Sequence, residues 1–423
     1  TVLTLIVLPI LFKVFDSKEF KRSKLKKDKK HLTVILLLLA SSFGFAQNTN
    51  MSREAVIAKA LENNKGIKAA ALQVNKMQEN IKSSFTFEKT NVYYSYDQNN
   101  LALNNLPLKV FGVQQRFLFP TVYGVQKKAN TSEFEKEKAD YELQKNKLSL
   151  QVAKTYEQIV YWQHQERLYS YLDSLYQNFS KASDRRFELG ETNYLEKITA
   201  QSKYRQIKTK LTQINFEKKA QYESLQALVQ SDEKISILEK ELVPIPTLDT
   251  TSNKAIHTAY LESISKMYKS QISLQKQHWL PDLNLEYFQG RNNGLSQSLY
   301  GFQVGIAVPI LFSGNVSKTK VAQLESQSWE EQKQNQEQKM TQFIRQQQNE
   351  IAKYQESINY YNATGKKLSE EIIKVANSSY KNGEIDFFQY IQSLENAVAI
   401  KIEYVEAVLQ FNSNQLELHY LNF

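Results

Sequence analysis

Three residue types are scarce or missing. Cysteine does not occur among the 423 residues, which excludes disulfide bonds and thiolate chemistry. Glycine and proline number only 12 and 7, and so poor a supply of turn-forming residues favours a few long elements over many short ones.

Sequence signatures of catalysis are absent as well. The chain has no GxxxxGK(S/T), GxGxxG or GxSxG segment. None of its five histidines forms a close pair or an HExxH motif, and only four methionines occur. The histidines are His31, His164, His257, His278 and His419. We therefore expect no enzymatic activity, no metal site and no cofactor.

The positive charge is concentrated near the beginning of the sequence. The formal net charge is +10, and Lys13–Lys30 holds nine Lys or Arg against three acids, a net of 9 − 3 = +6. Everything from Gln47 onward contributes only 10 − 6 = +4. Residues 1–12 are apolar but too short to span a bilayer, so we expect the end of a transmembrane helix followed by a basic cytoplasmic linker at 13–31. No nucleic-acid partner is expected.

Residues 32–46 have the pattern of a signal peptide. An apolar stretch follows the basic segment and ends with small residues at Gly44 and Ala46, which predicts cleavage before Gln47. An uncleaved membrane helix is the alternative. Both interpretations send the chain from residue 47 onward across the membrane.

One arrangement of residues occurs twice. Gly190 and Gly383 each interrupt a long helical pattern and are 383 − 190 = 193 residues apart. The same offset relates Phe119 to Phe312, each of which follows a leucine and closes an alternating apolar run. We interpret this match as an internal duplication. The expected divisions are a first repeat at 47–230, a linker at 231–253 and a second repeat at 254–423.

Hydrophobic periodicity predicts the same order of elements in both repeats, helix, hairpin, long helix and returning helix. In the first repeat they are helix 52–84, strands 91–96 and 110–119, helix 121–189 and a helix from 194 onward; in the second they are helix 255–277, strands 283–288 and 300–308, and helices 315–380 and 386–419. The helix over 121–189 would be about 100 Å long, so it needs long neighbours to cover its apolar stripe. The predicted fold is mainly α-helical, with two β-hairpins.

Each predicted hairpin has a bulky apolar face and a small or polar face. Such strands of about ten residues fit a membrane barrel, although a half-buried strand of a soluble sheet has the same pattern. Four strands cannot close a barrel, which needs about eight, and lipid tolerates no open sheet edge. If these strands span a membrane, the chain must therefore oligomerise, and three copies would give a barrel of twelve strands. The residues expected to line its lumen are Gly112, Gln114, Arg116, Gln303 and Gly305.

The ordered set of elements resembles the TolC-type family of outer-membrane efflux channels over residues 47–423. The resemblance implies a homotrimer with one twelve-stranded barrel in the outer membrane and a tunnel of long helical hairpins in the periplasm. It also implies that the two glycine turns lie at the periplasmic tip, where an adaptor protein docks. The tip residues that this assigns are Phe187, Gly190, Glu191, Tyr380, Gly383 and Glu384.

The same resemblance implies a constriction just after each turn. The family usually has acidic residues after the second turn, but Gln389 and Gln392 occupy the expected positions here. Asp386 lies nearby, and Glu196 is the first-repeat equivalent of Gln389. These four residues are the candidates for the tunnel constriction.

Residues 4–12 resemble the end of the last membrane helix of an RND-type efflux pump of the heavy-metal branch. Together the two resemblances imply a passive exit duct that receives substrate, in the first place heavy-metal cations, from an RND pump through an adaptor. Export of drugs or secreted proteins is the alternative. A periplasmic coiled-coil scaffold is the alternative from a different class of protein.

Overall fold

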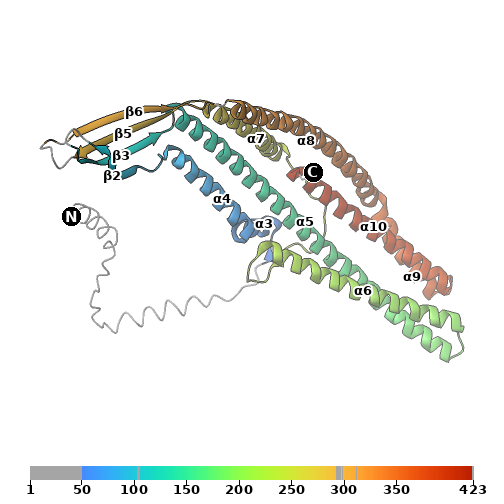
Figure 1. Cartoon of the computed structure of the whole chain (residues 1–423). Helices are drawn as coiled ribbons and strands as arrows, with labels where there is room; N and C mark the ends of the chain where they lie inside the picture. Colours follow the sequence, from blue (N-terminus) through green and yellow to red (C-terminus); the bar gives the residue numbers. More distant parts are fainter. Residues whose placement is uncertain (1–49, 102–104, 292–296, 298, 311, 422–423) are drawn as a thin grey trace, which may run out of the picture. The chain divides into compact units, whose positions relative to one another are not determined.

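The computed structural model describes residues 50–101, 105–291, 297, 299–310 and 312–421 (Figure 1). The pump-tail segment, the basic linker and the signal peptide predicted at 1–46 lie outside these residues. Every element below belongs to one compact unit, which the contacts place at 49–423.

The second unit contains long helices and one four-stranded sheet. In chain order the elements are β1 (Asn50–Met51), α3 (Arg53–Asn63), α4 (Lys65–Lys82), a 3₁₀ turn η1 (Ser83–Phe85), β2 (Asn91–Leu101), β3 (Pro107–Phe117), α5 (Pro120–Glu188), α6 (Tyr194–Val229), β4 (Ser236–Ile237), α7 (Thr251–Gln277), β5 (Asp282–Arg291), β6 (Leu299–Ala307), α8 (Ser313–Tyr360), a π-helical turn η2 (Tyr361–Gly365), α9 (Lys366–Lys381) and α10 (Phe387–Tyr420). The predicted fold class, long helices with two hairpins, is confirmed.

The long helices of the two halves have matching boundaries at the offset of the sequence repeat. α5 begins at Pro120 and ends at Glu188, and the segment from α8 to α9 begins at Ser313 and ends at Lys381. Both boundaries are displaced by the same number, 313 − 120 = 193 and 381 − 188 = 193. α6 and α10 obey the same relation, since their starts differ by 387 − 194 = 193. Figure 1 shows the sheet at one end of α5 and the turn into α6 at the other.

The predicted helix over 52–84 is two helices, α3 and α4. Ser52 caps the first as expected, because its Oγ accepts a hydrogen bond from the Ala55 N–H at 3.3 Å. Asn64 ends α3 and caps α4, and its Nδ2 also donates to the Leu228 carbonyl at 2.9 Å. The break depends on that distant carbonyl, which local periodicity does not reveal.

The predicted helix over 315–380 is also interrupted, by the π-helical turn η2. Gly365 lies in this turn, where an added Cβ would approach Ile400 to 3.2 Å. Four residues later, the buried Ser369 Oγ donates to the Ala397 carbonyl of α10 at 2.8 Å. The turn therefore lies where the backbone passes close to α10.

The four longer strands form one antiparallel sheet in the order β2-β3-β5-β6. Within the first hairpin Asn91 pairs with Gln114, and within the second Asp282 pairs with Ala307. β3 and β5 join the hairpins, with Phe117 opposite Leu283. β2 and β6 are the two edges of this sheet.

The main core surrounds the middle of α5. Buried side chains from α3, α4, α5, α6, α8, α10 and the linker meet there; those of α5 are Leu148, Val152, Tyr156, Ile159 and Val160. Each fully buried side chain of this size stabilises the fold by about 1.5–3 kcal/mol. This packing meets the requirement that so long a helix be covered by long neighbours.

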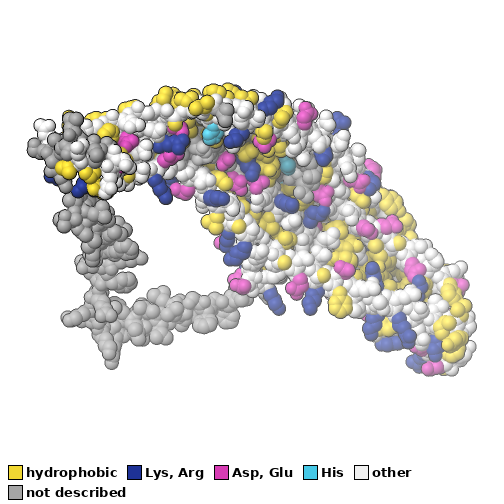
Figure 2. All heavy atoms as spheres, viewed as in Figure 1, with side chains coloured by type: hydrophobic (Ala, Val, Ile, Leu, Met, Phe, Trp, Pro, Cys, Tyr) yellow, Lys and Arg dark blue, Asp and Glu magenta, His cyan; other side chains and the backbone are white. Residues whose placement is uncertain are grey.

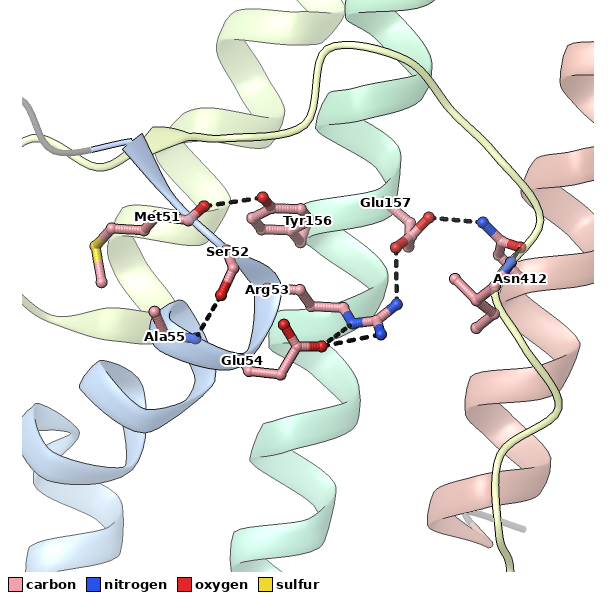
Figure 3. A network of polar contacts seen from close by, with 9 residues as sticks. Met51, Ser52, Arg53, Glu54, Ala55, Tyr156, Glu157 and Asn412 are labelled. Atoms are coloured by element: carbon pink, nitrogen blue, oxygen red, sulfur yellow. Dashed lines mark hydrogen bonds and ion pairs between the residues drawn. The ribbon is translucent and has the colours of Figure 1, made fainter.

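A polar network ties the N-terminal segment to this core (Figure 3). Arg53 pairs with Glu157 of α5 at 3.1 Å, and Asn412 of α10 donates to the other carboxylate oxygen at 2.8 Å. The Tyr156 hydroxyl donates to the Met51 carbonyl at 2.9 Å. Burial raises the pKa of Glu157, although its bonds from Asn412 and Arg53 act in the opposite direction. The sequence did not single out Arg53, Glu157 or Asn412, because these residues come from three separate helices.

Candidate functional site

Both glycine turns have the same backbone geometry. Gly190 and Gly383 have φ values of 74° and 75°, in the left-handed region that a glycine adopts without strain. The N–H after each glycine bonds the carbonyl five residues earlier at 2.8 Å, from Glu191 to Arg186 and from Glu384 to Ser379. These are Schellman ends, which stop a helix and reverse the chain.

Arg186, at the end of α5, connects the two turns. Its Nη1 donates to Glu196 of α6 at 3.1 Å and to the Tyr380 hydroxyl of α9 at 3.0 Å. The Thr192 hydroxyl donates to the second oxygen of Glu196 at 2.5 Å. Glu196 is only 9% exposed, and Arg186 of the same chain balances its charge. The link joins the first repeat to the second.

An aromatic cluster underlies this link. The rings of Tyr380 and Tyr390 stack at 4.8 Å, and Phe179 lies 5.3 and 5.0 Å from them. Burial raises the pKa of Tyr390 to about 12 and also raises that of Tyr380. Both phenols are therefore neutral at physiological pH, and Tyr390 donates to Asn377 at 2.7 Å.

The second turn carries a reciprocal helix cap. The Asp386 carboxylate accepts from the Gln389 N–H at 2.8 Å, and the Gln389 side chain accepts from the Asp386 N–H at 3.1 Å. Glu384 accepts from Ser379 at 2.8 Å. Gln392 is exposed and makes a weak bond to Asn396 at 3.4 Å. The structure thus brings Asp386 and Gln389 together as a helix start.

The remaining tip residues lie around the first turn. Phe187 packs against Tyr194 at 5.8 Å, and the Lys197 ammonium lies 4.8 Å from its ring centre. Glu191 is exposed, with a carboxylate oxygen 4.0 Å from Arg186.

The five residues predicted to line the lumen share one face of the sheet. Gln114, Glu286 and Gln303 lie in one row across β3, β5 and β6, and Arg116, Asn284 and Gly305 lie in the next. Gly112 occupies a third row. Paired positions on adjacent strands project their side chains to the same side.

Two contacts on this face explain residue choices. The Tyr93 ring covers Gly112, where an added Cβ would lie 2.2 Å from the ring. The Tyr93 hydroxyl of β2 donates to Glu286 of β5 across the intervening strand β3. Arg116 pairs with Asp282 at 2.5 Å, at the helix-proximal end of the sheet.

The opposite face of the sheet is apolar and exposed. Its β6 side chains Phe302, Val304 and Ile306 are 74%, 75% and 65% exposed, and Tyr94 of β2 is 65% exposed. Figure 2 shows apolar side chains along the upper edge, where Figure 1 places β6 and the start of α8. An exposed apolar face of this kind is typical of a surface that contacts lipid or another protein.

Within the described part of the chain, no group of three His, Cys, Asp or Glu residues is placed to hold a metal ion. Burial lowers the pKa of His164 and His257 and so favours the neutral form of both imidazoles. Among the described helices, none has both the length and the hydropathy to cross a membrane.

Comparison with known proteins finds similarity in structure alone. No family model matches the sequence, and no curated protein matches it. The CmeC outer membrane channel of Campylobacter jejuni superposes with a TM-score of 0.72 at 14% identity, over 88% of this chain and 85% of CmeC. The outer membrane protein VceC of Vibrio cholerae gives 0.71 at 15% identity, over 87% of this chain and 95% of VceC. The chain has the fold of these outer-membrane proteins. A membrane protein from Pseudomonas aeruginosa gives 0.74 at 13% identity, over 88% and 92%.

The sequence did not single out Arg186, although its side chain bonds both the first repeat and the second. Its partners Glu196 and Tyr380 lie 10 and 194 residues away. The one available signal is its place just before a turn already marked by the repeat.

Proposed function

We propose that residues from about 47 onward form one third of a trimeric outer-membrane exit duct, which conducts substrate passively from an inner-membrane RND pump and a periplasmic adaptor to the exterior. The observation that carries this proposal is the sheet. It has two open edges, β2 and β6, and an exposed apolar face. Open edges are not tolerated in lipid, so closure requires further copies of the sheet. The structural likeness to outer-membrane channels supports the same conclusion.

In this proposal the helices are the wall of a periplasmic tunnel. α5 has 69 residues. At about 1.5 Å per residue it carries the tip roughly 100 Å from the sheet. The polar face with Gln114, Gln303 and Arg116 lines the barrel lumen, together with the glycines Gly112 and Gly305.

The tip is proposed as the gate and the adaptor contact. On the first turn, Phe187, Gly190 and Glu191 are the proposed adaptor contacts. Glu196 and its bonds to Arg186 and Thr192 are the proposed part of the gate. On the second turn the contact residues are Tyr380, Gly383 and Glu384, and Asp386, Gln389 and Gln392 face the constriction. The Arg186–Tyr380 bond holds the two helical pairs together in the closed form, and adaptor docking is proposed to break it.

Heavy-metal cations are the proposed cargo, on the resemblance at residues 4–12. Drugs and secreted proteins are the competing cargoes. The test is deletion followed by growth on zinc, cobalt, cadmium and copper, beside a panel of antibiotics and detergents. Lower tolerance to metals supports the assignment. Lower tolerance to antibiotics alone would replace metals by drugs.

The duct itself is tested by fractionation. We expect the protein in outer membranes, as a trimer by native mass measurement, with a mature N-terminus at Gln47. Recovery as a soluble protein that is not trimeric would instead favour the periplasmic scaffold. Channel conductance in planar bilayers is the direct readout of a duct.

A further inference from the structure

A groove between α5 and α7 contains four lysines close to the sheet. Its volume is about 630 Å³, and residues of both helices line it. Within the described part of the chain, none of the four lysines enters an ion pair, and Glu135 is the one acidic residue that lines the groove. Four like charges gathered in one groove create a positive potential that favours an anion. The lysines, all exposed, are Lys127, Lys128, Lys266 and Lys269.

The lysines lie at nearly the same level, near the sheet ends of the two helices. The Thr121 hydroxyl of α5 donates to the Gln277 side chain of α7 at 2.7 Å, so the start of α5 lies beside the end of α7. Lys128 is eight residues from the start of α5, 128 − 120 = 8, and Lys269 is eight from the end of α7, 277 − 269 = 8. The other two lysines are seven and eleven residues from these ends, 127 − 120 = 7 and 277 − 266 = 11. At 1.5 Å per residue the four lie about 10–17 Å along the helices, whereas Glu135 lies about 22 Å along α5.

The groove lies on the side of the apolar face of the sheet. Phe117 of β3 is paired with Leu283, and Leu283 is paired with Ile306, so these three side chains belong to the apolar face. The Phe87 ring lies 5.4 Å from the ring of Phe117 and 5.5 Å from that of Tyr123, which belongs to α5. The apolar face therefore continues onto the first turn of α5.

Aromatic rings lie between the apolar face and the lysines. Phe85 stacks on Tyr123 at 6.3 Å, and the Lys127 ammonium lies 5.9 Å from the ring centre of Phe85. Phe85 and Phe87 are 56% and 57% exposed. Lys127 lies about one helical turn beyond Tyr123, since 127 − 123 = 4. Along this side of the molecule the order is an apolar face, aromatic rings and then lysines, as in proteins that pass from hydrocarbon to lipid headgroups.

The ammonium groups are the available donors of the groove. Each of its four hydroxyls already donates to a backbone carbonyl of its own helix, at 2.8–3.1 Å. An ammonium has three donors and is a compact charge, which suits it to phosphate oxygens. The hydroxyls belong to Thr131, Ser132, Ser270 and Ser273.

We propose that this groove binds the phosphate headgroup of an anionic lipid in the leaflet nearest the helices. The proposal rests on the proposed placement of the sheet in a membrane. The acyl chains then lie along the apolar face, and the long lysine side chains bring their charges to the headgroup level. Each lysine near an anionic lipid surface strengthens binding about fivefold.

A lipid suits the groove better than a free anion does. The lysines are exposed, so their attraction for a small dissolved anion is screened by salt. A lipid is already held beside the groove by its chains, which gives its phosphate a high effective concentration. The continuity of the groove with the apolar face applies to a lipid alone.

The test replaces one lysine on each helix. The variant is Lys128→Gln with Lys269→Gln, which removes two charges and keeps residues that suit a helix. The matched control is Lys147→Gln with Lys254→Gln, which removes one exposed lysine from each of the same two helices. The control positions lie about 40 Å along α5, since 147 − 120 = 27. A third variant, Lys128→Arg with Lys269→Arg, keeps the charge.

The full-length protein is purified in detergent and titrated with phosphatidylglycerol or phosphatidylcholine, and native mass spectrometry counts the lipids bound to each assembly. We expect the unaltered protein to prefer phosphatidylglycerol. The glutamine pair in the groove is expected to lower the affinity for phosphatidylglycerol about 25-fold, at about fivefold for each lysine. The control pair and the arginine pair are expected to bind like the unaltered protein. Inorganic phosphate at the same concentration as the lipid is expected to displace none of it.

Three results would overturn the proposal. One is equal binding of the two lipids. Another is an equal loss in both glutamine pairs, because the effect would then come from net charge. Displacement of the lipid by inorganic phosphate would assign the groove to a free anion. In each case a conducting trimer leaves the proposed duct intact, whereas recovery of the protein as a soluble monomer would overturn the duct and the lipid site together.

Discussion

The bond between Arg186 and Tyr380 is expected to hold the tip closed. It is a charge-assisted hydrogen bond of 3.0 Å between the two repeats. Such bonds contribute about 1.5–3 kcal/mol when protected from water. The Arg186 side chain is 40% exposed, so about 1 kcal/mol is the appropriate figure after screening. That energy is a factor of about five in the closed-to-open ratio of one chain.

The perturbation is Tyr380→Phe, which removes the hydroxyl and keeps the ring stacked on Tyr390. If the three copies open together, the loss multiplies to about 3 kcal/mol, roughly 150-fold in the open population. Purified protein in planar bilayers reports this as a rise in mean conductance. Arg186→Ala is expected to raise conductance at least as far, because it also removes the bond to Glu196.

Arg185→Ala is the matched control. Arg185 is exposed on the same turn, and only its backbone carbonyl takes part in the bonds of the turn. It is expected to conduct like the unaltered protein. The double variant Arg186→Ala with Tyr380→Phe is expected to conduct like Arg186→Ala alone, because each of the two substitutions removes the same Arg186–Tyr380 bond. Equal conductance of Arg186→Ala and Arg185→Ala would refute the reasoning. The change would then be due to the loss of a positive charge and not to the loss of the bonds to Tyr380 and Glu196.

Three further predictions concern single residues. Gly383→Ala forces a side chain at φ 75° and is expected to lower stability by about 1–2 kcal/mol in thermal unfolding, whereas the helical Gly124→Ala should raise it by about 0.5–1 kcal/mol. Gly112→Ala places a Cβ 2.2 Å from a tyrosine ring and should reduce the amount of assembled protein in membranes, while Gly305→Ala, with 3.8 Å of room, should not. The raised pKa of Glu157 means that its contribution to stability is full below the unfolded value of about 4.3 and is lost as pH rises through the folded pKa. Glu157→Gln should remove that part of the pH dependence of the melting temperature.

The long elements were predictable from sequence because their signals are local. Seventeen buried residues of α5 recur along its length, and no proline interrupts them after Pro120. The strands were recognised by alternation of large and small residues. The break at Asn64 was not predictable, because it depends on a carbonyl 164 residues away. The two-residue strands β1 and β4 are too short to carry any pattern.

The candidate site likewise contains residues that the sequence predicted and residues that it did not. Gly190 and Gly383 were recognised because a repeat gives the same local feature twice, and both have the positive φ that requires glycine. Arg186 was missed because its role depends on residues brought together by folding. The burial of Glu196 likewise follows from packing, which a sequence does not display.

The equivalence of the two tips explains why glutamine stands where an acid was expected. Arg186 and Glu196 form an ion pair in the first repeat, and their equivalents at 186 + 193 = 379 and 196 + 193 = 389 are Ser379 and Gln389. Both charges are therefore absent together in the second repeat. Removing one member alone leaves a shielded charge without its partner, which is the costly case.

Giving the first tip the residues of the second tests this explanation. Arg186→Ser leaves the Glu196 carboxylate, 12% exposed, with Thr192 as its remaining side-chain donor, and should cost about 1–2 kcal/mol after allowance for the exposure of the arginine. Adding Glu196→Gln should restore part of that loss, because the unpaired charge is then gone. The measurement is thermal unfolding of the purified assembly. If the double variant is no more stable than Arg186→Ser, the absence of an ion pair in the second repeat does not explain the glutamine at position 389. The glutamine would then have to serve a role in the tunnel.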